Sequence, residues 1–377
     1  MRLRLEPLAV VASALLIAWL VFDLRVQQLR LEGDELVHVV LTQQLGHGKY
    51  SLRGTPVLQL PGFSRYLYDR AVHYNPPLYD VLLLGVRGVF SETFYVYVSL
   101  LASAFSACLV YRLTRLRTSP LGAAFAMAVF LGCPIVYLVS CRIWAEALLA
   151  LLICVIVECC ERERLAAAGL WGLGLLLAAA ALVKSSVLFV LPGLCWQVLR
   201  DRRRLLIVAG VPVAVSALWL GYVYYANAAS PPATVPADDR FQNAFVAQQA
   251  GKHALSFFVL PLLLNPGYAF ALLGLRRELW PYALSVSSAM LAFSSLAWIG
   301  VGTYHTKYIS VALPLLAVLA GSGFEELGRR LRARRRAFVC GAAAAIVASV
   351  LIVENTVHRR TWVAEVDPSL YLGTEER

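Results

Sequence analysis

The sequence predicts an all-α protein that crosses a membrane with about eleven helices. Of its 377 residues, 59% are hydrophobic and 15% are charged, whereas soluble domains average about 45–50% and about 25%. Apolar runs of about 20 residues, the length that spans a hydrocarbon core, recur along the chain. Short arginine clusters separate these runs, so the positive-inside rule explains the net charge of +11 better than nucleic-acid binding does. The eight cysteines form no Cys-x-x-Cys pair, which favours small buried thiols over disulfides or a zinc site.

The first apolar run, residues 7–24, follows a basic start and lacks a small-residue cleavage site, so we expect a retained helix with a cytoplasmic N-terminus. A long first outer loop, including interfacial helices, is expected to follow it. The later runs predict spans at residues 94–113, 120–139, 143–159, 164–183, 185–199, 204–226, 254–275, 279–300, 306–323 and 337–354.

Alternate crossings from this start place every arginine cluster in the cytoplasm, provided that the apolar stretch 77–90 does not cross. That stretch is short and contains Asp80 and Arg87, so we expect a helix lying in the outer interface. The segment 185–199 is the weakest expected span because it is short. The expected units are a first helix (1–24), an outer catalytic loop (25–93), a transmembrane module (94–226), an outer loop (227–253), C-terminal helices (254–354) and an outer tail (355–377).

Two adjacent carboxylates, Asp34 and Glu35, are the first candidates for chemistry because they follow the first span in a hydrophilic stretch. A carboxylate at a membrane surface can act as a general base, and a pair can hold a divalent cation such as Mg²⁺ or Mn²⁺. Gly33 permits a tight turn that would aim both side chains. The alternative is a solvated loop pair beside a helix end.

The stretch 73–79, His-Tyr-Asn-Pro-Pro-Leu-Tyr, is expected to start the interfacial helix, because a first helical turn tolerates proline. His73 and Tyr79 are candidate substrate-binding residues there. The alternative is a structural histidine within a tyrosine-rich interfacial anchor.

Arg142 and Glu146 are four residues apart and would share one helix face, with Glu146 about one turn inside an apolar run. An ionisable residue inside a membrane span is a candidate functional residue. The alternative is a structural ion pair between these two side chains.

Lys184 stands before two serines at the expected outer end of a span, which suits a phosphate at headgroup depth. The alternative is a lysine that snorkels to the interface. Basic and aromatic groups gather again at the outer start of a later span, which adds the candidates His305, Lys307 and Tyr308.

Together these segments resemble the C-type (GT-C) membrane glycosyltransferases, specifically the protein O-mannosyltransferases and lipid A aminoarabinose transferases. The resemblance covers about residues 1–200 and 304–320. Asp34 and Glu35 match the family's acidic pair, and residues 73–79 are a version of its His-Pro-Pro-Leu-Tyr stretch with Tyr74 and Asn75 inserted or substituted.

Three further elements carry the resemblance. Arg142 with Glu146 is similar to a Ser-Arg element followed by an acid. Lys184 is similar to the lysine of a Thr-Lys-Gly-Pro-like element, although two serines replace Gly-Pro. Lys307 and Tyr308, with Pro314, are similar to an Arg-Tyr…Leu-Pro element.

The resemblance implies an enzyme that takes a sugar from a polyprenyl-phosphate donor on the outer face of the membrane. We expect a bacterial inner membrane, with the site on its periplasmic face, because the sequence shows no retention signal or eukaryotic-length loop. Asp34 would deprotonate the acceptor in a single displacement that inverts the anomeric carbon. Arg142, Lys184 and Lys307 would hold the phosphate, and Glu146 or Glu35 would orient the acceptor or a metal. Acceptor choice would come from residues 25–93 and 227–253.

Two other classes of function remain open at this point. A transporter of lipid-linked sugars or lipids would place its site near the midplane, often at broken helices, and the Asn-Pro-Gly break at residues 265–267 fits that pattern. A non-catalytic scaffold of an envelope biosynthesis complex is the third class. The sequence does not name the sugar, nor whether the acceptor is a glycan, a lipid or a protein.

Overall fold

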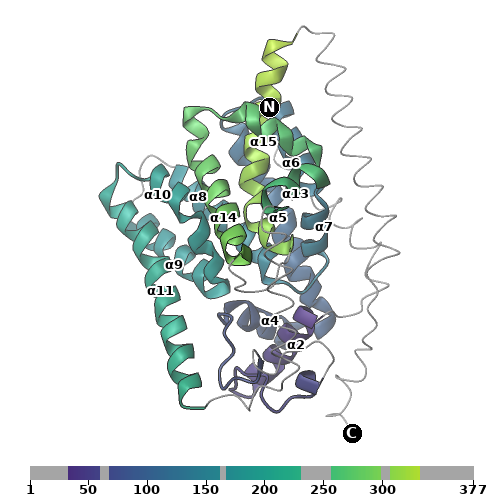
Figure 1. Cartoon of the computed structure of the whole chain (residues 1–377), viewed down its shortest axis with the longest axis vertical. Coiled ribbons are helices and arrows are strands. Elements are labelled where there is room, and N and C mark those ends of the chain that lie inside the picture. Colours follow the sequence, from purple (N-terminus) through teal and green to yellow (C-terminus); the bar gives the residue numbers. More distant parts are fainter. Residues whose placement is uncertain (1–32, 60–67, 162–166, 231–255, 299–305, 332–377) are drawn as a thin grey trace.

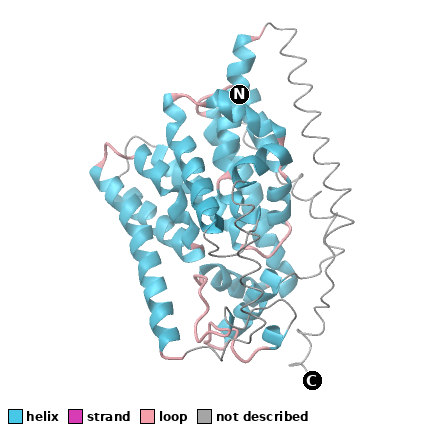
Figure 2. Ribbon diagram, viewed as in Figure 1, coloured by secondary structure: helices cyan, strands magenta, loops and turns pink. Residues whose placement is uncertain are grey.

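The computed structural model of the chain describes residues 33–59, 68–161, 167–230, 256–298 and 306–331. Within these ranges the chain consists of α-helices, 3-10 helices and connecting loops, without a β-strand (Figure 2). The predicted all-α class is therefore confirmed. The expected spans 7–24 and 337–354, the outer tail and most of the loop 227–253 lie outside the described residues.

Most helices run along the long axis of a bundle (Figure 1). We call one end the α2 end, because α2 (Gly33–Gly46) and α4 (Leu78–Val89) lie there, and the other the arginine end, because Arg115, Arg202 and Arg330 lie at helix ends there. The bundle helices are α5 (Tyr95–Arg115), α6 (Pro120–Leu131), α7 (Pro134–Ser140), α8 (Ala145–Glu161), α9 (Ala167–Val183), α10 (Leu191–Gln197), α11 (Arg202–Ala228), α13 (Ser256–Leu264), α14 (Trp280–Trp298) and α15 (Leu313–Arg330).

Among the described residues, three helical stretches are long and apolar enough to cross a membrane: α5, α11 and Arg277–Leu296. Two bent pairs bring the number to five, namely α6 with α7, bent by 65°, and α13 with η5 (Pro266–Gly274), bent by 115°. The expected count of about eleven is therefore not confirmed for the part of the chain that the structure describes.

Prolines divide several of the runs that the sequence analysis treated as single helices. The expected span 120–139 breaks before Pro134, and the expected span 254–275 breaks before Pro266. The segment 185–199 consists of η4 (Ser185–Val190) and the short α10, which has a proline in its first turn. Proline lacks an N–H and clashes with the preceding turn, so it starts a new helix where it cannot continue an old one.

Close helix contacts hold the centre of the bundle together. α15 packs against α6, α5 and η5. A Cβ atom at Gly323 would overlap the carbonyl oxygen of Phe270, and one at Gly274 would overlap that of Leu319, so the absence of a side chain allows α15 and η5 to approach. The seven cysteines in the described ranges carry free thiols.

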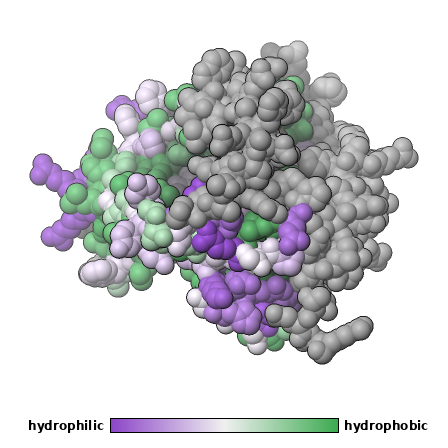
Figure 3. All heavy atoms as spheres, turned by 60° about the horizontal axis from the view of Figure 1, so that its bottom comes forward, coloured by the Kyte–Doolittle hydropathy of each residue, from purple (hydrophilic) through white to green (hydrophobic). Residues whose placement is uncertain are grey.

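The first-loop segments form a small unit at the α2 end. Side chains of α2 pack with the following loop in a hydrophobic cluster separate from the bundle core, made of Leu36, Val37, Val40, Leu41, Leu52 and Val57. α4 has 12 residues, or about 18 Å at 1.5 Å per residue, which is shorter than the hydrocarbon core. Hydrophilic side chains gather on the described surface of this end (Figure 3).

Candidate active site

Four charged side chains from separate parts of the chain meet at the α2 end. Asp34 comes from the first turn of α2, Glu146 from the first turn of α8, Lys184 from the residue before η4, and Lys307 from η7 (Thr306–Val311). We call these four residues the lysine–carboxylate cluster. α2 begins at Gly33, so Asp34 lies in the first turn of a helix, within the segment expected to form the first outer loop with its interfacial helices.

One half of the cluster is the ion pair between Lys307 Nζ and Asp34 Oδ2. Lys307 is buried, whereas the Asp34 side chain is 37% exposed. The ammonium group lies 4.5 Å from the centre of the Trp144 ring and 5.8 Å from that of Tyr308. Aromatic faces attract a cation, so these rings help to hold Lys307 in place.

The other half is the ion pair between Lys184 Nζ and Glu146 Oε1, which are 2.5 Å apart. Lys184 also lies 4.8 Å from the centre of the Tyr308 ring, so this tyrosine contacts both lysines. Glu146 interacts electrostatically with Lys307 as well as with Lys184. The two pairs therefore form one continuous cluster.

Glu35 and Arg142 form a third ion pair beside the cluster. Glu35 Oε2 accepts a bond from Arg142 Nη1 at 2.7 Å, and Oε1 accepts one from the Ile143 N–H at 3.0 Å. Both side chains are buried. Arg142 does not share a helix face with Glu146 as the four-residue spacing predicted, because α8 begins only at Ala145 and Arg142 lies in the turn before it.

Three aromatic rings from the first loop stand near Asp34. His73 stacks with Tyr74, with ring centres 4.5 Å apart, and with Tyr68 at 6.0 Å. We call Tyr68, His73 and Tyr74 the three-ring cluster. Asp34 interacts electrostatically with all three. Burial, and to a smaller extent His38, lowers the pKa of His73 to about 3, while Asp34 opposes that shift.

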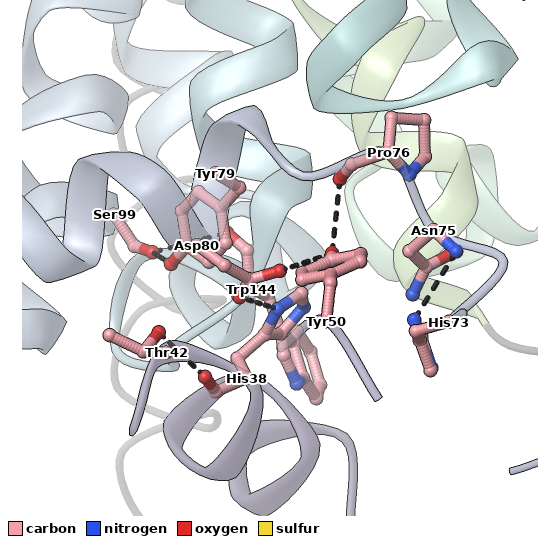
Figure 4. Close-up of polar contacts among 10 residues, drawn as sticks. All are labelled: His38, Thr42, Tyr50, His73, Asn75, Pro76, Tyr79, Asp80, Ser99 and Trp144. Carbon is pink, nitrogen blue, oxygen red and sulfur yellow. Dashed lines mark hydrogen bonds and ion pairs between the residues drawn. The ribbon is translucent and has the colours of Figure 1, made fainter. Parts of the chain in front are cut away.

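A buried hydrogen-bond network, which the sequence analysis did not single out as a site, joins α2 to α4 (Figure 4). The Asp80 carboxylate accepts from His38 Nδ1 at 2.7 Å and from the Tyr50 hydroxyl at 2.6 Å. His38 follows Asp34 by four residues, and this helical spacing could have indicated from the sequence that His38 belongs to the site.

The candidate Tyr79 does not join the lysine–carboxylate cluster. The Tyr79 hydroxyl bonds to Ser99 Oγ at 3.2 Å, and its ring is fully buried against His38, so Tyr79 is a core residue. His305 lies outside the described residues.

The donor set does not fit a divalent cation on Asp34 and Glu35. Both Glu35 oxygens are bonded to Arg142 and to a backbone N–H, and Asp34 is bonded to Lys307. Among the described residues, no three His, Cys, Asp or Glu side chains come together as a metal site.

Comparisons with known proteins give a result at the level of structure. No protein-family model matches the sequence, and no curated protein matches it. Two crystal structures of ArnT from Cupriavidus metallidurans match the fold. The structure in the apo state gives a TM-score of 0.61 at 17% identity, and the structure bound to undecaprenyl phosphate gives 0.59 at 15%.

Each match covers 97% of this chain and 67% of the ArnT chain. ArnT is a C-type aminoarabinose transferase. At these identities the match establishes the fold. The chain therefore has the fold of ArnT, which belongs to the class of enzymes that the sequence motifs resemble.

Proposed function

We propose that the chain is an integral-membrane glycosyltransferase that moves a sugar from a polyprenyl phosphate to an acceptor at the outer face of a bacterial inner membrane. The observation that carries this proposal is the lysine–carboxylate cluster, which places two lysines beside a partly exposed carboxylate at one end of an apolar bundle. Such a cluster offers cations for a phosphate and a base for an acceptor. ArnT, which shares the fold, has been crystallised with undecaprenyl phosphate.

In the proposed reaction, Asp34 takes the proton of the acceptor group as that group attacks the anomeric carbon. The bond from this carbon to the phosphate oxygen breaks on the opposite face, so the configuration inverts. The donor is a phosphodiester with one negative charge, and the released polyprenyl phosphate carries more. Lys184 and Lys307 therefore interact more strongly with the transition state than with the donor, which is the condition for catalysis.

Binding of the donor also changes the state of Asp34. In the structure each lysine is already paired with a carboxylate. Phosphate oxygens compete with Asp34 for Lys307, and a carboxylate that loses its cation binds a proton more strongly. The donor therefore prepares the base. Arg142 is engaged by Glu35, so we assign it to positioning the start of α8 beside the phosphate site.

The test is transfer of labelled hexose from a polyprenyl phosphate by the purified protein, with and without a membrane extract as acceptor. Loss of a general base lowers rates by about 10²–10⁴-fold, so Asp34→Asn should abolish both transfer and slow donor hydrolysis. Asp69→Asn is the matched control, because Asp69 pairs with Arg53 outside the cluster. Equal rates in wild type and Asp34→Asn would remove Asp34 from the chemistry.

A transporter of lipid-linked sugars is the second candidate, because α13 and η5 form a broken pair. At that break, the Asn265 amide donates to the Val129 carbonyl at 2.9 Å and its oxygen accepts from the Gly267 N–H. The Asn265 side chain thus forms hydrogen bonds with the backbone around the break, which favours a structural bend over a substrate site. Tight donor binding without sugar release from a panel of donors would reverse this preference.

A further inference from the structure

Hydrogen bonds from other parts of the chain to the backbone of residues 72–74 hold His73 in place. Its own N–H donates to the Tyr50 carbonyl at 2.8 Å. The Asn227 side chain bonds both to the N–H and to the carbonyl of Val72, and the Trp219 indole donates to the Tyr74 carbonyl. Both of these α11 residues therefore fix the position of the three-ring cluster.

The hydrogen bonds of His73 define which ring nitrogen carries the proton. Nδ1 accepts from the Asn75 N–H at 3.2 Å (Figure 4). A neutral imidazole that accepts at Nδ1 carries its hydrogen on Nε2 and donates from there. The low pKa of His73 keeps the ring neutral at physiological pH.

The Nε2–H of His73 is a buried donor that has no hydrogen-bond partner among the described residues. His73 is only 1% exposed. A buried donor without a partner has lost its hydration without compensation, so such a group is expected to meet a lone pair in the working state. The ring stacks on Tyr74, which is 42% exposed, and it lies within the electrostatic influence of Asp34.

We infer that His73 binds the acceptor, and that the reacting group of the acceptor is a hydroxyl. This inference rests on the proposed function. The hydroxyl oxygen has two lone pairs: one accepts the His73 Nε2–H bond and the other attacks the anomeric carbon. Its proton goes to Asp34. The exposed Tyr74 ring beside His73 offers an apolar face for the ring of a sugar acceptor.

An amine does not fit the same pair of groups. A protonated amine has no lone pair to accept from His73. A neutral amine has one lone pair, and a hydrogen bond from His73 would occupy the electrons that must attack. The number of available lone pairs therefore favours hydroxyl acceptors over amines.

The first test uses the wild-type protein, a labelled polyprenyl-phosphate hexose and a membrane extract in which amines have been blocked by selective N-acetylation. We expect transfer to the blocked extract at the same rate, within twofold, as to the untreated extract. A loss of more than tenfold on blocking would overturn the hydroxyl assignment.

The second test uses His73→Phe, which keeps an aromatic ring without the N–H. It measures the concentrations of extract and of donor that give half-maximal transfer, and compares each with the wild-type value. We expect the extract concentration at half-saturation to rise at least tenfold, with a change below threefold for the donor. His73→Gln, whose amide nitrogen reaches about the place of Nε2, should restore most of the extract affinity. His47→Phe, at an exposed histidine of the same end, is the matched control.

An unchanged half-saturation by the extract in His73→Phe would overturn the inference while transfer itself persists. Failure of the wild-type protein to release sugar from any donor would instead overturn the proposed function. The two failures are thus distinguishable, and the amine-blocking test does not depend on the folding of any variant.

Discussion

Asp34 and Glu35 are neighbours in sequence but occupy opposite environments. Asp34 is partly exposed beside Lys307, whereas Glu35 is buried against Arg142. Successive residues on a helix point about 100° apart, so the first turn of α2 sends one carboxylate to the cluster and the other into the protein. In the proposed function this division gives Asp34 a chemical role and Glu35 a positioning role.

We predict that Glu35→Gln destabilises the protein, because it removes the buried negative charge that pairs with the buried Arg142. Breaking a buried pair in this way costs about 3–5 kcal/mol. Asp34→Asn should change stability far less, since its side chain is 37% exposed. Thermal unfolding in detergent, followed by tryptophan fluorescence, measures both. A wild-type melting temperature for Glu35→Gln with lost transfer would place Glu35 in the chemistry instead.

His73 gives a prediction on pH. Its folded pKa is about 3 because the ring is buried, whereas an unfolded histidine has a pKa of about 6.5. Between these values the unfolded state binds the extra proton, so stability falls as the pH drops below about 6.5. Between pH 7 and pH 5, protonation of this residue in the unfolded state should lower the free energy of unfolding by about 2 kcal/mol.

Melting temperatures of the wild type and His73→Phe at pH 7 and pH 5 test this prediction. The melting temperature should fall less on acidification in the variant than in the wild type, because the phenylalanine ring cannot take up a proton. His38 is present in both proteins and cancels in the comparison. Equal falls would show that His73 takes up its proton as readily in the folded state as in the unfolded chain.

The sequence predicted which charged residues gather at one end, but not how they pair. Alternating apolar runs place Lys184, Lys307 and Glu146 at the ends of helices on one side, and the structure brings these three together with Asp34. Partner choice depends on where each helix starts and how it is rotated. Arg142 illustrates the limit, because a helix starting three residues earlier would have directed it toward Glu146.

At the scale of elements, the buried Asp80 carboxylate of α4 is a polar link to α2 and to the loop that follows α2. Asp80 accepts from His38 of α2 and from Tyr50 of the following loop. Because His38 lies one turn after Asp34 on α2, we expect the orientation of Asp34, the proposed base, to depend on the bond between His38 and Asp80. The two lysines of the cluster belong to other elements, so their positions do not depend on this bond.

We therefore predict that Asp80→Asn lowers kcat about tenfold, since small misplacement of a reacting group has large effects on rate. The asparagine side chain has one acceptor oxygen in place of two, so it cannot accept both hydrogen bonds in the way that the carboxylate does. The KM for the lipid donor should stay within threefold of wild type. Tyr50→Phe should show a weaker form of the same effect, with Tyr222→Phe, at an exposed tyrosine of α11, as its control. A raised donor KM with unchanged kcat would contradict the positioning role.

Helix boundaries were less predictable than helix content. Apolar composition predicted the runs at 120–139 and 254–275, yet each contains a bend before a proline. A proline in an apolar run can bend a helix or start a new one, and the surrounding packing decides between these outcomes. At Asn265 that packing is the bond to the Val129 carbonyl, which joins segments 136 residues apart in sequence.

At the scale of the whole molecule, the two ends of the bundle have different chemistry. The arginine end is tied by ion pairs, of Arg117 with Glu161 and of Arg276 with Glu326. Glu161 also accepts from Gln197 at 2.5 Å and from the Tyr282 hydroxyl at 2.8 Å. Since Lys184 meets Glu146 at the other end, the segment between Lys184 and Gln197 connects the two ends.

This polarity predicts the orientation in the membrane. Arginine is retained on the cytoplasmic side, so the arginine end should face the cytoplasm and the α2 end the periplasm. A single cysteine introduced as Lys49→Cys, at an exposed residue of the α2 end, should react with a membrane-impermeant maleimide in intact spheroplasts. Arg200→Cys, at an exposed residue of the arginine end, should react only after lysis. The wild-type protein measures the background from its eight native cysteines. The opposite labelling pattern would put the lysine–carboxylate cluster in the cytoplasm, and a periplasmic acceptor would then have no access to Asp34.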